Sequence, residues 1–412
     1  MTETEYYESD YYTQSEYPPM TLPLDGVRVI DLGQIFAVPY CTLQLAYLGA
    51  EVIKIEPLGT GEHLRRPASS PGGVNYSFLM LNPNKKSVTL NLKQPDGRAL
   101  LMRLLESADI LTENYSAGVM DSLGLGWDTL REHFPRLIFA SIKGYGSDGP
   151  WARLGAMDST LQAACGLISI TGYPDRPGVR TPATFIDMAT GSHLVSAILA
   201  AIIQRGRTGR GQLVEVSMHD VCIPSMTGLI ANELEGKPCD RVGNRHRNAC
   251  PSNIYQCRDG ELMIFCLTEP HWHSLVKLMG REDLIASPQH KDHASRYKIV
   301  ADVDALVGEW TRQHRRDDLV TLFIDHGIPC APVRSVAEVT ADPEVARRRM
   351  LLDSESAARG KIKVMGSPLK FTDTDARAPL PPPVLGEHTA EVLATIGVDS
   401  TELARLRTTG TI

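Results

Sequence analysis

Short apolar segments alternate with helical segments along the first half of the chain, and this alternation constrains the fold most. In one helical segment, Leu100, Leu101, Leu104 and Leu105 form an apolar stripe. Strands that alternate with helices form a parallel sheet covered by helices on both faces. The sequence therefore predicts an α/β fold with a doubly wound sheet. We expect strands at 27–32, 51–55, 87–92, 110–112, 137–142 and 212–217, and helices at 39–48, 96–107 and 188–204.

The segments around this pattern predict the domain organisation. Residues 1–19 are rich in acidic residues and tyrosine but poor in aliphatic side chains, so burial cannot offset the entropy of ordering them. We therefore expect a disordered tail at 1–19, a large domain at 20–217 and a linker at 218–240. A smaller α+β domain should follow at 241–335.

The smaller domain should contain a hairpin at 254–265, because Asp259-Gly260 favours a tight turn. Helices over 270–325 and a short strand at 327–333 should complete it. Residues 336–412 should form a second linker, Pro-rich at 379–383, and then helices that return to the large domain.

Composition argues against several classes of partner. The net charge of −7 disfavours nucleic acid, whose phosphates attract basic surfaces. The sequence contains no stretch of about 18 uninterrupted apolar residues, so it predicts no membrane span, and the first residues do not resemble a signal peptide. The eight cysteines include no C-x-x-C pair and no set of four zinc ligands. We expect a cytoplasmic protein without a metal, whose cysteines are reduced and mostly buried.

A glycine-rich segment, Gly144–Gly149, follows a predicted strand and fits the pattern G-x-G-x-x-G. In a dinucleotide site this segment should open a helix, but Pro150 and a further glycine-containing stretch follow it here. The pattern favours a turn-rich loop, with a nucleotide-dependent oxidoreductase as an alternative.

Asp187 lies between an extended apolar stretch, 183–186, and a helix that we expect to begin near Met188. Asp at such a junction is a good N-cap, which is a purely structural role. A carboxylate at a helix start is also stabilised as the anion, so we expect it to be ionised at neutral pH and able to act as a covalent nucleophile. Asp158 and Asp175 are competing candidates, although Asp175 lies in a segment typical of a turn.

Several basic residues could form a local patch within this acidic protein. Such a patch would suit a ligand with several phosphates, whereas a solvated charged loop is the alternative. The residues concerned are Arg65, Arg66, Lys85, Lys86 and Lys93.

An ordered series of segments then points to one family. It comprises LDGVRVIDL at 24–32, LGAEVIKIEP at 48–57, NPNKKS at 82–87, ENY at 113–115, TGRGQ at 208–212, GIPCAPV at 327–333 and LGEHT at 385–389. The series resembles the family III CoA-transferases, which include formyl-CoA:oxalate and carnitine CoA-transferases and the related α-methylacyl-CoA racemases. The resemblance covers roughly residues 22–412.

The resemblance implies a Rossmann-like large domain built from both chain ends, a smaller domain, and two subunits interlocked as a homodimer. It implies acyl-CoA and small carboxylic acids as substrates, with no permanently bound cofactor. The nucleophile of the family falls on Asp187, which would carry coenzyme A as an aspartyl thioester while N–H groups at the helix start stabilise the oxyanions. The coenzyme A contacts fall on Phe36, Ala37, Leu90, Asn91, Leu92, Lys93, Asn114, Tyr115, Ser116, Leu154, Gly155, Ala156 and Met157.

Some positions depart from the formyl-CoA enzymes. A glutamine of that pattern is Phe36 here, two arginines are Pro57 and Ser122, and a catalytic glutamate is Asp158. The glycine-run loop is replaced by ACPSN at 249–253. The resemblance therefore does not extend to oxalate as the acceptor, and the phosphates must be held partly by other residues.

The racemase alternative depends on a second acid/base group. The racemases of the family pair a histidine with the aspartate, and the histidine position is Met157 here. Methionine cannot carry a proton and is more typical of a flexible apolar filler that lines a pocket. The sequence thus favours a transferase over a racemase.

Overall fold

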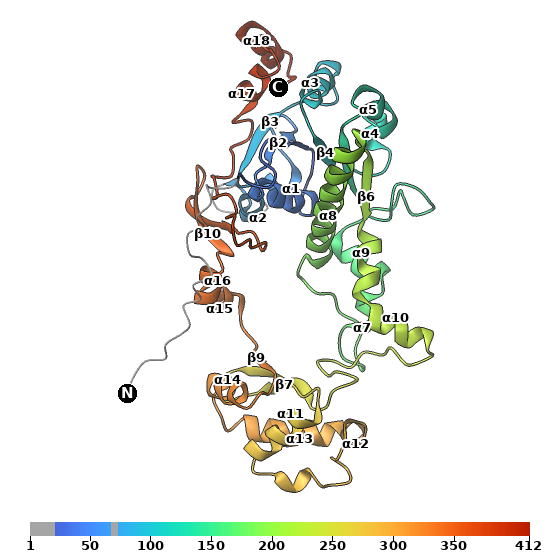
Figure 1. The fold of residues 1–412 in the computed structure, drawn as a ribbon, viewed down its shortest axis with the longest axis vertical. Coiled ribbons are helices and arrows are strands. Elements are labelled where there is room, and N and C mark those ends of the chain that lie inside the picture. Colours follow the sequence, from blue (N-terminus) through green and yellow to red (C-terminus); the bar gives the residue numbers. More distant parts are fainter. Residues whose placement is uncertain (1–20, 67–72) are drawn as a thin grey trace. The chain divides into compact units, whose positions relative to one another are not determined.

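The computed structural model describes residues 21–66 and 73–412, which form two compact units (Figure 1). Unit 1 comprises the described residues up to Cys165 together with Pro182–Met226 and Pro343–Ile412, and unit 2 comprises Gly166–Thr181 and Thr227–Asp342. The predicted tail at 1–19 lies outside the described residues. The predicted small domain, 241–335, falls inside unit 2, which starts earlier and also takes 166–181.

A six-stranded parallel sheet forms the centre of unit 1, with the strand order β3-β2-β1-β4-β5-β6. In register, Val29 of β1 lies opposite Val52 of β2 on one side and Ile110 of β4 on the other. The predicted doubly wound α/β fold is confirmed. The strands are β1 (Arg28–Asp31), β2 (Glu51–Glu56), β3 (Lys85–Thr89), β4 (Ile110–Glu113), β5 (Ile138–Lys143) and β6 (Leu213–Ser217).

The third strand differs from its prediction at 87–92, because it begins at Lys85 and ends at Thr89. A lysine inside a buried strand is unexpected from the sequence alone, since a buried charge is costly unless it has a partner. Here Asp31 at the end of β1 supplies that partner, 3.3 Å from the Lys85 ammonium. The strand can therefore start two residues earlier than its apolar pattern suggests.

The strand order reverses between β1 and β4, the two strands at the middle of the sheet. Open parallel sheets bind ligands in the crevice outside the carboxyl ends of the strands at this point. The segments that follow β1 and β4 are therefore placed to form a site.

Helices cover the sheet of unit 1 (Figure 1). Helices α1 and α8 lie in close contact, because Gly191 has no side chain to keep them apart; a Cβ there would lie 2.5 Å from the carbonyl oxygen of Ala37. The helical elements are α1 (Ala37–Tyr47), η1 (His63–Arg65), α2 (Tyr76–Leu81), α3 (Pro95–Leu105), α4 (Val119–Ser122), α5 (Trp127–His133), α6 (Asp158–Ala164), α8 (Phe185–Thr208), α9 (Met218–Ser225), α16 (Pro343–Arg347), α17 (Thr389–Ala394) and α18 (Ser400–Thr408).

By length and composition, one helix among the described residues, α8, could cross a membrane. Ile186, Leu194 and Ile198 on one side of this helix are buried inside unit 1. A core helix satisfies the same test, so this is weak evidence for a span.

The C-terminal segment returns to the sheet of unit 1, as predicted. The backbone N–H of Asn91 donates to the carbonyl oxygen of Thr411 at 2.8 Å, and the N–H of Thr89 donates to the Thr389 hydroxyl at 3.0 Å. Ile412 packs in the main hydrophobic core with side chains from β1 and α3. A hairpin of β10 (Leu351–Ser356) and β11 (Gly360–Met365) precedes this return.

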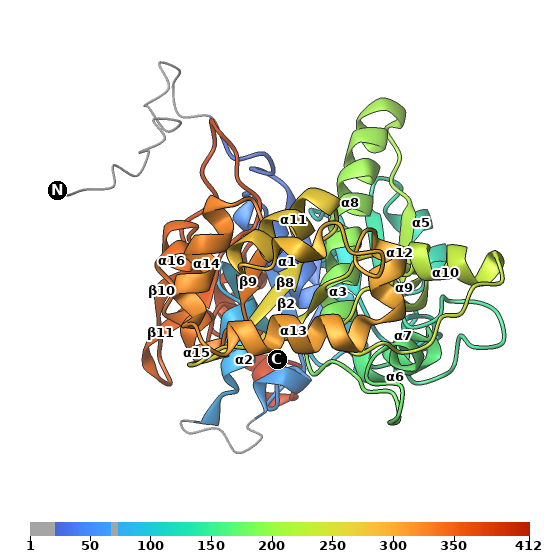
Figure 2. The ribbon, with the colours of Figure 1, turned by 90° about the horizontal axis from the view of Figure 1, so that it is seen from below.

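Unit 2 is built on a three-stranded antiparallel sheet of β7 (Ser252–Gln256), β8 (Glu261–Phe265) and β9 (Cys330–Pro332). The predicted hairpin and the predicted short strand are both confirmed. The helical elements of this unit are α7 (Leu167–Ile170), α10 (Thr227–Leu234), α11 (Glu269–Leu278), η3 (Glu282–Leu284), α12 (His293–Lys298), α13 (Val300–Thr311), α14 (Arg316–Asp325) and α15 (Val336–Thr340). Figure 2 shows α11, α13 and α14 beside β8 and β9.

All eight cysteines are free, and all except Cys239 and Cys330 are buried. The prediction of free and mostly buried thiols is confirmed. Burial raises the pKa of Cys250 to about 12, as expected for an unreactive thiol in a core.

Candidate active site

A cavity of about 350 Å³ lies at the carboxyl ends of β1, β4 and β5, where the strand order predicts a ligand crevice. All the residues that line it belong to unit 1. Most of the residues implied by the resemblance lie here, although they come from distant parts of the chain. They are Phe36, Ala37, Asn114, Tyr115, Ser116, Leu154, Ala156, Met157 and Asp187.

The other implied contacts do not line this cavity. Leu90 is buried in the main core, and the Asn91 amide donates to the carbonyl oxygen of Gly410 at 3.3 Å. Leu92 packs partly buried against the same core, whereas Lys93 and Gly155 are exposed. Their contact with coenzyme A stays a prediction.

Asp187 lies in the first turn of α8, which begins at Phe185 and has Thr184 at the N-cap position. The predicted N-cap role of Asp187 is therefore wrong, and the helix starts three residues earlier than expected. The cap comes instead from Asp158 of α6, whose Oδ2 accepts the N–H groups of Ile186 at 2.8 Å and Asp187 at 3.2 Å. A partner from another helix thus allows α8 to begin without a local capping side chain.

The Asp187 carboxyl group has no hydrogen bond to its oxygens among the described residues of the chain. Burial raises the pKa of Asp187 to about 7, and the negative charge of Asp158 adds to this effect. The sequence led us to expect an ionised group at neutral pH, whereas burial and the neighbouring charge both favour the protonated form.

The two competing aspartates have different surroundings. Asp158 lines the cavity but is only 7% exposed, and its Oδ1 accepts a hydrogen bond from Gln162 at 2.6 Å while Oδ2 caps α8. Asp175 belongs to unit 2, is exposed and lies near Arg176. Of the two carboxylates that line the cavity, Asp187 thus has fewer hydrogen-bond partners.

Two side chains with nitrogen donors at the cavity, Lys143 and His63, were not singled out from the sequence. Lys143 donates to both carboxylate oxygens of Glu113, at 2.8 and 2.9 Å, and to the carbonyl oxygen of Tyr115 at 2.7 Å. All three protons of the Lys143 ammonium group are used in these hydrogen bonds. His63 also lines the cavity and is exposed. Lys143 ends a strand at the carboxyl edge, which is the signal that could have identified it.

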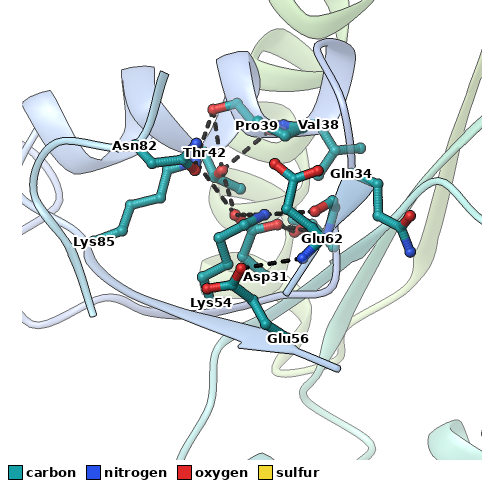
Figure 3. Close-up of polar contacts among 12 residues, drawn as sticks. Asp31, Gln34, Val38, Pro39, Thr42, Lys54, Glu56, Glu62, Asn82 and Lys85 are labelled. Atoms are coloured by element: carbon teal, nitrogen blue, oxygen red, sulfur yellow. Dashed lines mark hydrogen bonds and ion pairs between the residues drawn. The ribbon is translucent and has the colours of Figure 1, made fainter. Parts of the chain in front are cut away.

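The predicted basic patch does not exist, because two of its members are buried in ion pairs. Lys85 contacts Asp31, as Figure 3 shows, and also donates to the Asn82 amide oxygen at 2.9 Å. The Arg65 guanidinium donates to both oxygens of Glu56, at 2.7 and 2.9 Å. Lys86 pairs with the carboxylates of Glu51 and Glu391.

The glycine-rich segment after β5 forms turns and bends, with no helix directly after it, so the loop prediction is confirmed. Gly144 lines the cavity and lies close to Ala156, since a Cβ on Gly144 would lie 2.1 Å from the Ala156 Cβ. Met157, the position at which the racemase pattern has its histidine, lines the cavity with 55% of its surface exposed. Among the described residues, no cluster of three His, Cys, Asp or Glu side chains could hold a metal ion.

Comparisons with known proteins identify the family of the chain. The model of CoA-transferase family III matches residues 24–389. An acyl-CoA transferase from Fusarium pseudograminearum is 35% identical over 401 aligned positions, which cover 94% of this chain and 88% of that protein. A formyl-CoA:oxalate CoA-transferase from Escherichia coli O157:H7 is 33% identical over 414 positions, which cover 94% and 99%. The crystal structure of a CAIB/BAIF family protein from Brucella suis matches with a TM-score of 0.82 and 31% identity, over 92% of this chain and 100% of that chain.

Proposed function

Since the chain belongs to CoA-transferase family III, we propose that it moves coenzyme A from an acyl-CoA donor to a small carboxylic acid through a thioester on Asp187. One observation carries the assignment of the nucleophile. Asp187 lines a cavity whose other walls include Phe36, Ala37 and Asn114, three of the contacts that the resemblance implies.

The reaction proceeds in four steps. The ionised Asp187 attacks the thioester carbonyl of the donor, the C–S bond breaks, and coenzyme A leaves as the thiolate. The thiolate then attacks the aspartyl carbonyl of this mixed anhydride, which releases the donor acid and forms an aspartyl-CoA thioester. The acceptor carboxylate attacks the carbonyl of that thioester, the C–S bond breaks, and coenzyme A leaves again as the thiolate from a second mixed anhydride. The thiolate then attacks the acceptor's acyl carbonyl in this anhydride, which yields the new acyl-CoA and restores the Asp187 carboxylate.

A carboxylate suits this sequence because the anhydride and the thioester are both high in energy. Little of the donor thioester's free energy is therefore lost at any step. A serine nucleophile would form an ordinary ester, from which return to a thioester is unfavourable.

The oxyanions of these steps need hydrogen-bond donors. The N–H groups of Ile186 and Asp187 are engaged by Asp158, so the start of α8 is less available than the sequence suggested. Helix α1 offers an alternative, because it has no side-chain cap and its first residue, Ala37, lines the cavity. We propose the Ala37 N–H as an oxyanion donor.

Incubation with an acyl-CoA and an isotope-labelled carboxylate tests the function. Transfer of coenzyme A to the labelled acid supports it, and hydroxylamine trapping followed by mass spectrometry should modify Asp187. Asp187→Ala is the control and should give neither product nor adduct. Trapping at Asp158 or Asp175 would contradict the assigned nucleophile. A panel of acids assayed with acetyl-CoA and succinyl-CoA would identify the donor and the acceptor.

A CoA-thioester racemase is the second candidate, because His63 lines the same cavity as Asp187 and could supply the other acid/base group. Uptake of solvent deuterium at the α-carbon of an acyl-CoA would favour it. A nucleotide-dependent oxidoreductase would instead require tight NAD binding at the Gly144–Gly149 loop.

We also propose that the enzyme acts in the cytoplasm as a homodimer, without a nucleic acid or membrane partner. The net charge of −7 and the family resemblance support these expectations. Light scattering coupled to size-exclusion chromatography measures the oligomeric state directly.

A further inference from the structure

The turn between β1 and α1 forms one wall of the cavity, through Gln34, Ile35 and Phe36. Ile35 has a φ of 66°, in the left-handed region. A β-branched residue is a genuine outlier there, because its side chain crowds its own backbone. Surrounding contacts must therefore hold the turn in this conformation.

Buried side chains hold the residues before Ile35. The Gly33 N–H donates to the Asp31 carboxylate at 2.7 Å, and the Gly33 carbonyl oxygen accepts from the Lys54 ammonium at 2.6 Å. Next in the turn, the backbone N–H of Gln34 donates to the Asn114 amide oxygen at 2.8 Å. The Asn114 amide N–H donates in return to the backbone carbonyl oxygen of Gln34 at 2.9 Å. Figure 3 shows Asp31, Lys54 and Gln34 together around this turn.

Glu62 holds Ile35 itself. Its Oε2 accepts the Ile35 N–H at 3.0 Å and also the Leu64 N–H at 2.9 Å. Leu64 lies in η1, where the neighbouring His63 lines the cavity. One carboxylate oxygen, on a side chain that is 1% exposed, therefore joins two segments of the cavity wall.

We propose that Glu62 is a positioning residue, which holds Ile35 in its left-handed conformation and so shapes the wall against which coenzyme A binds. This inference rests on the proposed function. Glu62 is not among the residues that line the cavity, so it acts through Ile35 and η1 and not by touching the substrate.

A double-mutant cycle tests the coupling, with coenzyme A binding measured by titration calorimetry. Glu62→Ala should raise the Kd about tenfold, the effect expected for one hydrogen bond to a charged group. Glycine adopts a positive φ without crowding, so coenzyme A binding by the Ile35→Gly variant should depend much less on Glu62. Glu62→Ala in that background should raise the Kd by about twofold or less.

Asp399→Ala is a matched control, because Asp399 also uses a carboxylate to accept backbone N–H groups, at the start of α18. It should leave the Kd unchanged. Equal effects of Glu62→Ala in both backgrounds, or no effect in either, would overturn the proposal, because Glu62 would then support the fold in general or not at all.

Hydrogen exchange of the ligand-free protein separates this inference from the proposed function. Loss of Glu62 should speed exchange of the Ile35 amide by about tenfold or more, while the amides of α18 keep their rates. If the wild-type chain bound no coenzyme A, the proposed function would fail, and the exchange of Ile35 would still decide whether Glu62 holds the turn. Unchanged exchange at Ile35 would remove the positioning role.

Discussion

Asp158 accepts the backbone N–H of Asp187 at 3.2 Å, so two carboxylates meet at the start of α8 with unequal sets of partners. The Asp158 carboxylate also accepts hydrogen bonds from the backbone N–H of Ile186 and from the Gln162 side-chain amide. Among the described residues, none donates a hydrogen bond to the carboxyl oxygens of Asp187. A buried acid beside another acid, without donors, retains its proton to higher pH.

The pH profile of coenzyme A transfer should follow the ionisation of Asp187. Because the pKa of this group is raised to about 7 and only the anion attacks, kcat/KM should rise with pH and level off above that value. Initial rates at limiting donor and saturating acceptor, measured from pH 5 to pH 9, give kcat/KM for the donor and so report the enzyme form in which Asp187 is a free carboxyl group. A profile that is already flat at pH 5 would contradict it.

Asp158→Asn should move that profile toward lower pH. The substitution removes a negative charge beside Asp187 and keeps one oxygen that can cap α8, so we expect a decrease of about one pH unit in the midpoint. Burial, the larger cause, stays, so the midpoint should not return to the usual value for aspartate. Asp175→Asn, in unit 2, serves as the control and should leave the profile unchanged.

Asp187→Asn should abolish transfer, and at alkaline pH it should have a higher free energy of unfolding than the wild type. The pKa of Asp187 in the folded chain, about 7, lies above the ordinary aspartate value of 3.8, so ionisation opposes folding increasingly as the pH rises from about 4 to about 7. Below that window the variant should match the wild type, and at pH 8 it should gain about 1–3 kcal/mol. Urea unfolding at pH 5 and pH 8 measures the difference. An equal gain at both pH values would assign it to packing instead.

Asp31→Asn should destabilise unit 1 strongly. Asp31 faces the ammonium groups of Lys54 and Lys85, and all three side chains are fully buried. Burial alone would raise the pKa of Asp31, but these cations and the hydrogen bonds from Thr42 and Gly33 outweigh it and lower that pKa. Removing the anion leaves two buried cations without their partner, at a cost of about 3–5 kcal/mol.

The control for Asp31 is Asp353→Asn, because Asp353 pairs with Lys363 on the surface of the β10–β11 hairpin. That loss should be below about 1 kcal/mol. Denaturant unfolding compares the two variants, and similar losses would show that burial does not decide the strength of these pairs.

Gly144→Ala should weaken both stability and coenzyme A binding. The new methyl group would lie 2.1 Å from the Ala156 Cβ, so the cavity wall at Ala156 must move. We expect a loss of about 1–3 kcal/mol in unfolding free energy. Gly206→Ala is the control, since a Cβ there meets nothing within 4 Å. Thermal unfolding and calorimetric titration with coenzyme A check both effects.

The sequence by itself determined the parallel sheet and its helices, because apolar periodicity is a local property of each segment. It predicted β1, β2, β4, β5 and β6 within a residue or two of their bounds, and the stripe of leucines on α3 packs in the main core as expected. It also determined that Asp187 stands near a helix start, since a change from extended to helical periodicity marks such a junction.

Only the tertiary structure decided which charges are buried and which carboxylate caps α8. Lys85 is inside because Asp31, which is distant in sequence and ends β1, places a carboxylate 3.3 Å from its ammonium group. Asp158 reaches the start of α8 from another helix, and burial together with the Asp158 charge raises the pKa of Asp187. Burial and charge pairing depend on the distances between segments that are far apart in the chain, and no local pattern contains those distances.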